Sequence, residues 1–330
     1  MPIQVNELSK HFKMFKREAG LSGAFHSFFN RKYETFHALK DISVQIEDGK
    51  IFGILGENGA GKTTLIKLLV GLLHPSSGEV NINGFTPWNR KAAFLKQISV
   101  VMGQKNQLWW DIPASESFLL NQKIYEIPQI QYKNTLDELV DLLSVQDKLN
   151  VQVRRLSLGE RMKMEIIAAL LHNPKIVLLD EPTIGLDVIS QLKIRDFVKY
   201  YNKKYKTTFL LSSHYMHDIQ ALCKRVFVIH KGASLYDGDF DKLVNRVNPK
   251  RKLLFEFTEI PDKIQTKRLL EKYKFHLNDT ILHAELPDKE LTKLVSELFH
   301  LGVPASITME DLPVEDTMRS FFTDPEKFLE

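Results

Sequence analysis

The sequence lacks the features of a disulfide-bonded, a membrane-spanning or a secreted protein. It has one cysteine, Cys223, which excludes an internal disulfide and fits a reducing compartment. It has no apolar run approaching the roughly 20 residues that cross a bilayer. Its first residues, MPIQVNELSK, do not have the pattern of a signal peptide. We therefore expect a protein in the cytosol or on the cytosolic side of a membrane.

Excess charge, repeats and low-complexity tracts are also lacking. The formal net charge of +4 is too small to demand a nucleic-acid partner, and none is expected. The 330 residues can bury a substantial core, so one large domain and a small one are the natural expectation.

Apolar strands alternate with helices along most of the chain. Strands are predicted within 38–50, 50–56, 175–180 and 207–214, and helices within 61–73 and 190–205. The stretch from about 105 to 172 is mostly helical in pattern, and a hairpin turns at Lys231–Gly232. This alternation predicts an α/β domain with a largely parallel, helix-covered sheet.

The pattern restarts near residue 246. The segments that follow read strand, helix, strand, helix, strand, which predicts a small α+β domain. The predicted domains are therefore 1–245 and 246–330.

A glycine-rich loop between an apolar strand and an apolar helix carries the strongest chemical signal. GENGAGKTT, residues 56–64, fits the pattern G-x-x-x-x-G-K-[ST] in the context that this motif requires. Its glycines allow the backbone N–H groups to face a β-phosphate. Lys62 places a cation between the β- and γ-phosphates, and the Thr63 hydroxyl can bind Mg²⁺. The candidate ATP-binding residues here are Gly56, Glu57, Asn58, Gly59, Ala60, Gly61, Lys62, Thr63 and Thr64.

Polar residues end three other apolar strands. Asp180 ends KIVLLD, at the sheet edge where ligands of such sheets bind, and can hold Mg²⁺ through water. Glu181 is then placed to orient or deprotonate the attacking water. His214 follows FLLSS and is a candidate γ-phosphate contact, and Gln104 follows another strand and could reach Mg²⁺ or water.

A second, incomplete phosphate-binding corner lies far from the first in the sequence. RRLSLGER, residues 154–161, places Ser157 and Gly159 immediately before an apolar helical segment. A serine and a glycine at a helix start suit a bound anion. The sequence therefore has one complete nucleotide cradle and half of another.

Taken together, these motifs resemble those of the ATP-binding subunit of a bacterial ABC transporter, over about residues 3–240. GENGAGKTT is similar to the Walker A motif, VVMGQ to the Q-loop, LSLGE to the family signature, KIVLLDEP to Walker B and LLSSH to the switch histidine. IGLD, ending at Asp187, resembles the D-loop. Tyr33 lies where the family has an adenine-stacking aromatic residue.

The resemblance implies a P-loop NTPase cassette with a RecA-like core, a helical subdomain at about 105–172 and an antiparallel β subdomain. ATP and Mg²⁺ are the implied cofactors. Glu181, His214 and Gln104 would be catalytic, and Thr63, Gln104 and Asp180 would hold the metal. Because Glu181 and His214 are both present, we expect an active ATPase.

The same resemblance accounts for the half site. In this family two cassettes pair head to tail, and the signature of one completes the ATP site of the other. Ser157, Leu158, Gly159 and Glu160 would thus act in trans, in a homodimer or with a related cassette. The commonest signature is Leu-Ser-Gly-Gly-Gln, so Leu158 replaces a glycine, and Glu160 replaces the glutamine and puts a negative charge near a phosphate.

Two further stretches are candidate contacts with a membrane or a membrane subunit. The segment at about 13–32 is extra for this family and mixes basic and aromatic residues: Lys13, Lys16, Arg17, Arg31, Phe15, Phe25, Phe28 and Phe29. It could equally pack over the cassette's own flank. Trp109 and Trp110 could line the groove for the membrane subunit's coupling helix, or belong to the core.

Three functional hypotheses follow. The first is an ATPase subunit that drives export through separate integral membrane permease subunits, as a peripheral protein on the cytoplasmic face of the cell membrane. The second is an importer ATPase. The third is a soluble ABC ATPase that acts on nucleic acid or ribosomes, which the single cassette, the single cysteine and the lack of a long heptad run disfavour. Fold alone does not separate them.

Overall fold

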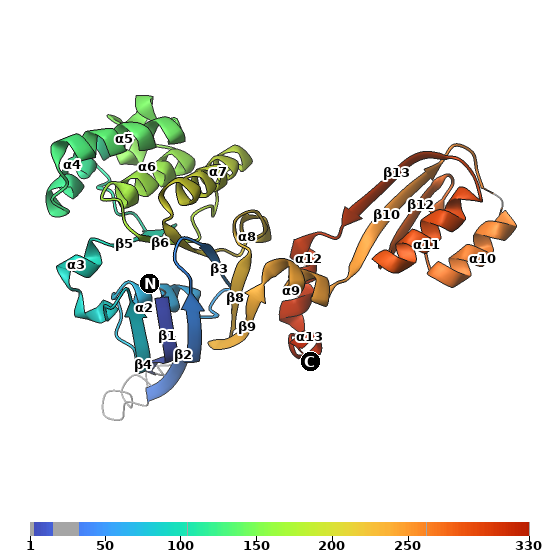
Figure 1. Cartoon of the computed structure of the whole chain (residues 1–330), viewed down its shortest axis with the longest axis horizontal. Coiled ribbons are helices and arrows are strands. Elements are labelled where there is room, and N and C mark those ends of the chain that lie inside the picture. The colour runs from blue at the N-terminus through green and yellow to red at the C-terminus, as the bar shows by residue number, and fades with distance from the viewer. Residues whose placement is uncertain (1–2, 16–32, 104, 262, 330) are drawn as a thin grey trace, which may run out of the picture. The chain divides into compact units, whose positions relative to one another are not determined.

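The computed structural model describes residues 3–15, 33–103, 105–261 and 263–329 (Figure 1). The chain divides into two compact units, Met1–Gly238 and Asp239–Glu330. The division precedes the boundary predicted at residue 246, because helix α9 (Phe240–Val247) packs on α12 (Val314–Thr323) of the second unit. Within the described residues, no helix is both long enough and apolar enough to cross a bilayer.

A six-stranded sheet forms the centre of the first unit, in the order β5-β6-β7-β3-β8-β9. From β5 to β8 every neighbouring pair is parallel. These strands have apolar residues on both faces because helices cover both faces of such a sheet. They are β3 (Ile51–Leu55), β5 (Ile98–Met102), β6 (Ile176–Asp180), β7 (Thr208–Ser212) and β8 (Arg225–His230). The edge strand β9 (Ala233–Asp239) is largely polar. The predicted α/β core and the hairpin at Lys231–Gly232 are confirmed.

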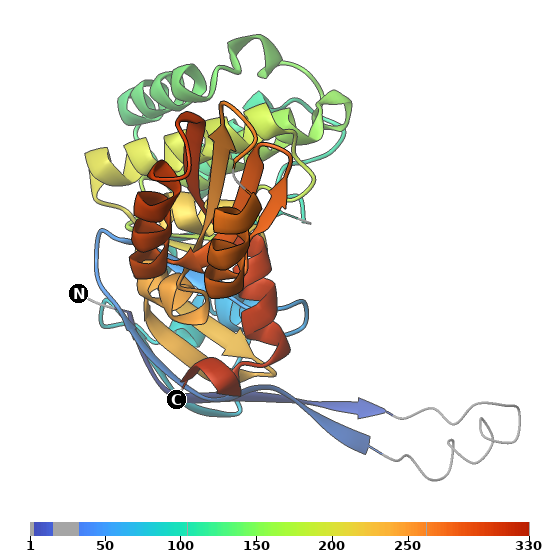
Figure 2. The same cartoon turned by 90° about the vertical axis from the view of Figure 1, so that its right-hand side faces the viewer.

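A separate three-stranded sheet, in the order β2-β1-β4, is antiparallel. Its strands are β1 (Ile3–Phe15), β2 (Tyr33–Ile46) and β4 (Ser77–Ile82). β1 and β2 run side by side along their whole length (Figure 2). β2 starts earlier than the predicted strand within 38–50, because its first residues pair with the end of β1. Residues 16–32, most of the predicted basic and aromatic insertion, lie outside the described residues.

Helix α2 (Lys62–Leu69) lies between the two sheets of this unit. Leu65 and Ile66 are fully buried in one apolar cluster with Val5 and Val44 of the antiparallel sheet and Leu178 of the parallel sheet. This packing fixes the start of α2, and therefore the glycine-rich loop before it, at the carboxyl end of β3.

The predicted helical stretch contains three long helices that pack on one another beside β5 (Figure 1). They are α4 (Ala114–Ile124), α5 (Gln129–Leu143) and α6 (Leu158–Leu170). Other helices of the first unit are α3 (Ala92–Leu95), α7 (Val188–Tyr205) and α8 (Met216–Leu222).

The second unit contains a four-stranded antiparallel sheet in the order β11-β12-β10-β13. Its β-α-β-β-α-β sequence is the split βαβ arrangement. The elements are β10 (Lys250–Phe257), α10 (Lys263–Tyr273), β11 (His276–Asn278), β12 (Ile281–Pro287), α11 (Asp288–Phe299), β13 (Pro304–Asp311) and α13 (Glu326–Leu329). The sequence pattern did not predict β11, because three residues are too few to show an alternation.

Candidate nucleotide site

The glycine-rich loop joins β3 to α2 in a conformation that requires glycine at two positions. Gly56 and Gly61 have φ values of +155° and +117°. A Cβ atom at Gly56 would lie 2.4 Å from the Ile229 carbonyl oxygen, and one at Gly61 would lie 2.6 Å from that of Ala38. The loop therefore packs against β8 and β2 too closely for any side chain.

Lys62 is folded back over this loop. Its ammonium group donates to the carbonyl oxygens of Gly56, at 2.8 Å, and Glu57, at 3.1 Å, and lies 3.9 Å from Glu181 Oε1. The side chain is 5% exposed. Burial lowers the pKa of Lys62, although the carboxylates of Glu181 and Asp180 oppose this effect.

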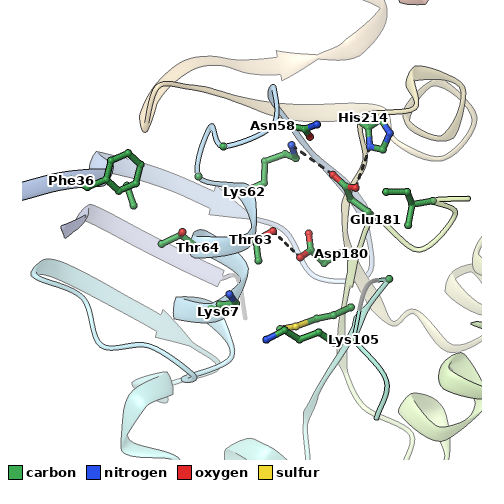
Figure 3. A pocket seen from close by; sticks show the side chains of 16 residues that line it. Phe36, Asn58, Lys62, Thr63, Thr64, Lys67, Lys105, Asp180, Glu181 and His214 are labelled. Carbon is green, nitrogen blue, oxygen red and sulfur yellow. Dashed lines mark hydrogen bonds and ion pairs between the residues drawn. The ribbon is translucent and has the colours of Figure 1, made fainter. Parts of the chain in front are cut away.

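Asp180 connects the start of α2 to the parallel sheet (Figure 3). The Thr63 hydroxyl donates to Asp180 Oδ2 at 2.9 Å, and the Ser212 hydroxyl donates to the other oxygen. Two hard oxygen donors, a hydroxyl and a carboxylate, thus meet at the carboxyl end of β6. This donor set suits Mg²⁺.

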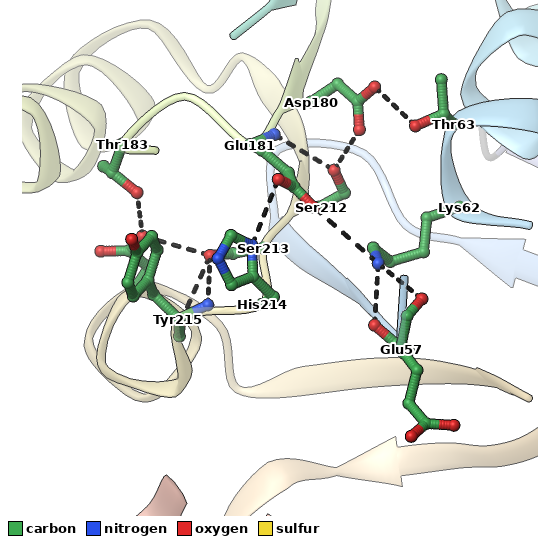
Figure 4. A network of polar contacts seen from close by, with 12 residues as sticks. Glu57, Lys62, Thr63, Asp180, Glu181, Thr183, Ser212, Ser213, His214 and Tyr215 are labelled. Atoms are coloured by element: carbon green, nitrogen blue, oxygen red, sulfur yellow. Dashed lines mark hydrogen bonds and ion pairs between the residues drawn. The ribbon is translucent and has the colours of Figure 1, made fainter. Parts of the chain in front are cut away.

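Glu181 is held in a left-handed backbone conformation, with φ of +53°. Its N–H donates to the Ser212 carbonyl oxygen at 2.9 Å. Its carboxylate lies 3.2 Å from His214 Nδ1, so Lys62, Glu181 and His214 form one line of charged and polar groups (Figure 4). A residue other than glycine keeps this strained backbone conformation only when the surrounding structure holds it there. The same surroundings therefore fix the direction of the carboxylate.

A buried network behind Glu181 supports both loops of the site. The Thr183 and Ser213 hydroxyls donate to Asp218 Oδ2, while Arg195 Nε lies 3.0 Å from its other oxygen. Asp218 is buried on α8, so this charge is compensated by an arginine and two hydroxyls. No motif surrounds Asp218, so the sequence does not predict its role.

One cavity of about 560 Å³, here named the Lys62 cavity, is lined by the glycine-rich loop and the ends of β6 and β7 (Figure 3). Its lining includes six of the predicted loop residues together with Asp180, Glu181 and His214: Asn58, Gly59, Gly61, Lys62, Thr63 and Thr64. Gly56, Glu57 and Ala60 are not among the lining residues. Three further residues that no motif predicts also line it: Phe36, Lys67 and Lys105.

Phe36 is the aromatic side chain that the described residues place at the mouth of this cavity, and it is 46% exposed. Tyr33, the predicted adenine-stacking residue, begins β2, and its side chain lies outside the described residues. Gln104 also lies outside them. Both assignments stay predictions.

The predicted signature lies at the start of α6 and does not line the Lys62 cavity of its own chain. Ser157 Oγ accepts from the Glu160 N–H at 3.2 Å, and Glu160 Oε2 accepts from the Ser157 N–H at 2.9 Å. This capping box satisfies the helix start within the chain. The exposed Leu158 lies between them.

Glu160 therefore has an intramolecular role that the sequence analysis did not foresee. Its hydrogen bonds with Ser157 lower its pKa, and Lys148 Nζ lies 3.4 Å from Oε1. The negative charge predicted near a phosphate therefore belongs to a carboxylate that caps α6 and is partly neutralised by Lys148.

Asp187 lies beside this signature. It caps α7 by accepting from the Ser190 N–H, at 2.9 Å, and hydroxyl, at 2.6 Å, and these bonds lower its pKa. A Cβ atom on Gly159 would lie 2.5 Å from Ser190 Oγ, so glycine is needed where α6 meets the start of α7.

The helix that begins at the signature also holds the segment after residue 104. Glu165, buried on α6, accepts from the N–H groups of Gln107, at 3.0 Å, and Leu108, at 3.3 Å. Burial raises its pKa. Trp109 and Trp110, which follow, are 62% and 44% exposed, so the core-packing interpretation is wrong.

Comparison with known proteins places these features in a family. The sequence model of the family described as ABC transporter matches residues 39–184. The ABC transporter ATP-binding protein NatA of Bacillus subtilis is 37% identical, over 65% of this chain and 87% of NatA. The bacitracin transport ATP-binding protein BcrA of Bacillus licheniformis is 33% identical, over 77% of this chain and 80% of BcrA.

Other similar proteins include an importer component and solved cassettes. The methionine import ATP-binding protein MetN 2 of Enterococcus faecalis is 34% identical, over 64% of this chain and 62% of MetN 2. A dimeric ATP-binding cassette, solved in a post-hydrolysis state with ADP and Pi, superposes with a TM-score of 0.61 at 23% identity. It covers 72% of this chain and 98% of the solved one, which shows the cassette fold.

Proposed function

Because the chain belongs to the ATP-binding proteins of ABC transporters, a family of ATPases, we propose that it hydrolyses ATP with Mg²⁺ in the Lys62 cavity and drives export through separate membrane subunits. The observation that carries the proposal is the convergence of Lys62, Asp180, Glu181 and His214 on one cavity. These groups come from three separate places in the chain, the start of α2, the end of β6 and the loop after β7, and general packing does not require them to meet.

Thr63 and Asp180 would hold Mg²⁺, with Gln104 as a further predicted ligand. Their hydrogen bond at 2.9 Å shows that both oxygens reach one point, and both are hard donors. The bound ion would neutralise phosphate charge as it develops. Lys62 lines the same cavity, and its ammonium group would exchange its carbonyl contacts for phosphate oxygens.

Glu181 is the proposed general base. It accepts the proton of the attacking water, while His214, 3.2 Å away, orients the carboxylate and contacts the γ-phosphate. Lys62 Nζ lies 3.9 Å from Oε1 of the same carboxylate, so the base and the phosphate-binding cation are neighbours. The exposed ring of Phe36 at the cavity mouth stacks on adenine, together with or in place of Tyr33.

A second cassette completes the site. Ser157 is exposed at the start of α6, outside its own chain's cavity, and its hydroxyl keeps a proton to donate because it only accepts from Glu160. Together with the Gly159 N–H it binds the γ-phosphate held by Lys62 of the other copy, or of a related cassette. Asp187 lies beside this signature through Ser190 and belongs to the same dimer surface.

The membrane subunits dock near the segment that follows Gln104. An apolar hollow of about 320 Å³, lined by Leu72, Val100 and Ile124 among others, lies beside α4, and Trp109 and Trp110 are exposed on the same segment. An amphipathic helix of a permease subunit fits such a surface. Glu165 joins this segment to the signature helix, so nucleotide state and membrane contact share one rigid element. The chain then acts at the cytoplasmic face of the membrane.

Export is supported by the appended second unit and by the resemblance to bacterial systems whose membrane subunits are separate chains. Import is the second candidate, and the similarity to MetN 2 favours it. BcrA, the bacitracin transport protein, matches over a larger share of its own length than MetN 2 does, 80% against 62%.

The test is capture of the partner, followed by a transport assay. A Glu181→Gln form, held closed with ATP, is used to isolate complexes from gently solubilised membranes. A stoichiometric polytopic membrane protein is the expected result, and capture of only ribosomal, DNA-bound or soluble proteins would overturn the transporter proposal. Inverted membrane vesicles then give the direction: ATP-driven accumulation of labelled bacitracin supports export, and release of preloaded methionine supports import.

A further inference from the structure

The second unit contains a cavity of about 700 Å³, rich in lysine and histidine, that the proposed function does not use. It lies wholly within Asp239–Glu330, and no part of the Lys62 cavity contributes to it. Its basic lining residues come from β10, the end of α10, β11 and β12: Lys250, Lys252, Lys272, Lys274, His276 and His283.

The cavity arises because β11 is shorter than its neighbour. β11 pairs with β12 only from His276, opposite His283, to Asn278, opposite Ile281. β12 continues to Pro287, so within the described part of the chain its last residues have no strand partner on that side. The chain between α10 and β11 leaves the sheet here, and Lys274 takes a left-handed conformation with φ of +51°.

The alternation of β10 aims two lysines away from the core. Leu253 and Phe255 are fully buried under α11, so Lys250 and Lys252 lie on the opposite, open face of the sheet. Arg251, between them, is paired with Asp288 and Asp311. Lys250, Lys252 and Lys274, by contrast, form no ion pair with any carboxylate that the structure describes.

Two carboxylates also line the cavity, and they limit the kind of ligand. Glu285 lies opposite Lys252 in the strand register, and Glu290 comes from α11. Lys272 is bound to Glu297, which does not line the cavity. Because Glu297 compensates Lys272, three unpaired lysines face two glutamates, so the lining keeps one uncompensated positive charge besides the two histidines.

We propose that this cavity binds a phosphate ester. Like-charged ammonium groups around one hollow repel one another, and an anion in the middle removes that repulsion. Lysine binds phosphate as a point charge, and the volume lies within the range of small-molecule sites. Glu285 and Glu290 accept hydrogen bonds from hydroxyl or amino groups next to the phosphate. A soluble phosphate ester and a phospholipid headgroup share this chemistry.

The test compares two variants with the same loss of charge. The pocket variant is Lys250→Gln with Lys252→Gln and Lys274→Gln. The control is Lys242→Gln with Lys289→Gln and Lys293→Gln, three exposed lysines of the same unit that do not line the cavity. Both are made in the full chain with Lys62→Ala, which weakens phosphate binding in the cassette. The binding result can therefore be interpreted even if the ATPase proposal fails.

Binding is measured with pyrophosphate by calorimetry and with phosphatidylglycerol vesicles by flotation. We expect at least one probe to bind the parent, to bind at least tenfold more weakly to the pocket variant, and to bind the control variant within about twofold of the parent. Loss with pyrophosphate identifies a soluble ligand, and loss with vesicles alone identifies a lipid headgroup. Binding of neither probe by the parent, or equal weakening in both variants, overturns the proposal.

The single variant Lys274→Gln keeps the test decisive if the triple variant fails to fold. Lys274 is exposed, so its substitution removes a charge without touching the core. It should weaken binding severalfold with unchanged thermal unfolding. Unchanged binding in this variant, together with a triple variant that unfolds, overturns the proposal as well.

Discussion

The two helix starts that carry phosphate-binding sequences differ in how far their own chain completes them. The loop before α2 lines a cavity and has a buried lysine folded over it, with Asp180 and Glu181 facing it. The start of α6 is exposed, lines no part of that cavity and is capped by its own Glu160. The start of α2 thus belongs to a binding site that its own chain nearly completes. The start of α6 is an ordered surface without a site of its own.

The difference shows that a binding surface can be well ordered although its own chain does not complete the binding site. The capping box fixes the backbone at Ser157 without using the proton of its hydroxyl, so this surface is prepared for an acceptor that its own chain does not supply. A preorganised donor binds with little additional ordering cost. In the proposed scheme that acceptor is the γ-phosphate on the other copy.

The largest effect on ATP hydrolysis is expected from a substitution in the Lys62 cavity. Glu181→Gln should lower kcat by about 10²- to 10⁴-fold, because it removes the proposed base while leaving the loop that holds the nucleotide. ATP binding should persist, and a dimer should accumulate, as measured by phosphate release and by light scattering. The control is Glu126→Gln, an exposed carboxylate paired with Lys96. Hydrolysis at the parent's rate would remove Glu181 from this role.

The next effect concerns the far end of the signature helix. His172 follows α6, stacks on Tyr125 with ring centroids 3.9 Å apart, and burial lowers its pKa to about 4. Because the unfolded chain binds this proton near pH 6.5, the group contributes fully above that pH, and its contribution is lost as the pH falls from 6.5 to 4. The loss should reach about 3 kcal/mol.

Urea unfolding at several pH values tests this, with His172→Phe as the variant that retains the stacked ring. The free energy of unfolding of the parent should fall more steeply than that of the variant between pH 6.5 and 4. Parallel curves would show that His172 does not report on the anchoring of α6.

The smallest effect concerns the capping box itself. Glu160→Ala should lower the free energy of unfolding by about 0.5–1 kcal/mol, because it removes the acceptor for the Ser157 N–H. Glu160→Gln keeps that acceptor and loses only the attraction to Lys148, so it should cost less. Chemical denaturation of both variants measures the difference. Equal losses would mean that the charge, not the cap, stabilises the helix start.

The parts of the site that lie within one short motif were predictable from the sequence. A strand, a glycine-rich loop and a helix that follow one another directly leave little freedom, so Lys62 and Thr63 are where the motif predicts. The convergence of Asp180 and His214 also followed, because parallel strands end at one sheet edge.

Contacts between residues far apart in the sequence were not predictable. Asp218 and Glu165 depend on how α8 and α6 pack, and Phe36 depends on the pairing of β2 with β1. The role of Glu160 was missed for another reason. S-L-G-E fits both the capping-box pattern and a phosphate-binding signature, and the two patterns predict different roles for the glutamate.

The central claim is that each Lys62 cavity needs the start of α6 from the other copy, and this claim has one direct test. Subunits with Ser157→Arg and subunits with Lys62→Ala are inactive alone, and an equimolar mixture is assayed for ATP hydrolysis. In each mixed dimer one site combines an intact lysine with an intact signature, so the mixture should recover up to about a quarter of the parent's rate. No recovery in mixtures whose mixed dimers are confirmed by affinity capture would contradict the claim.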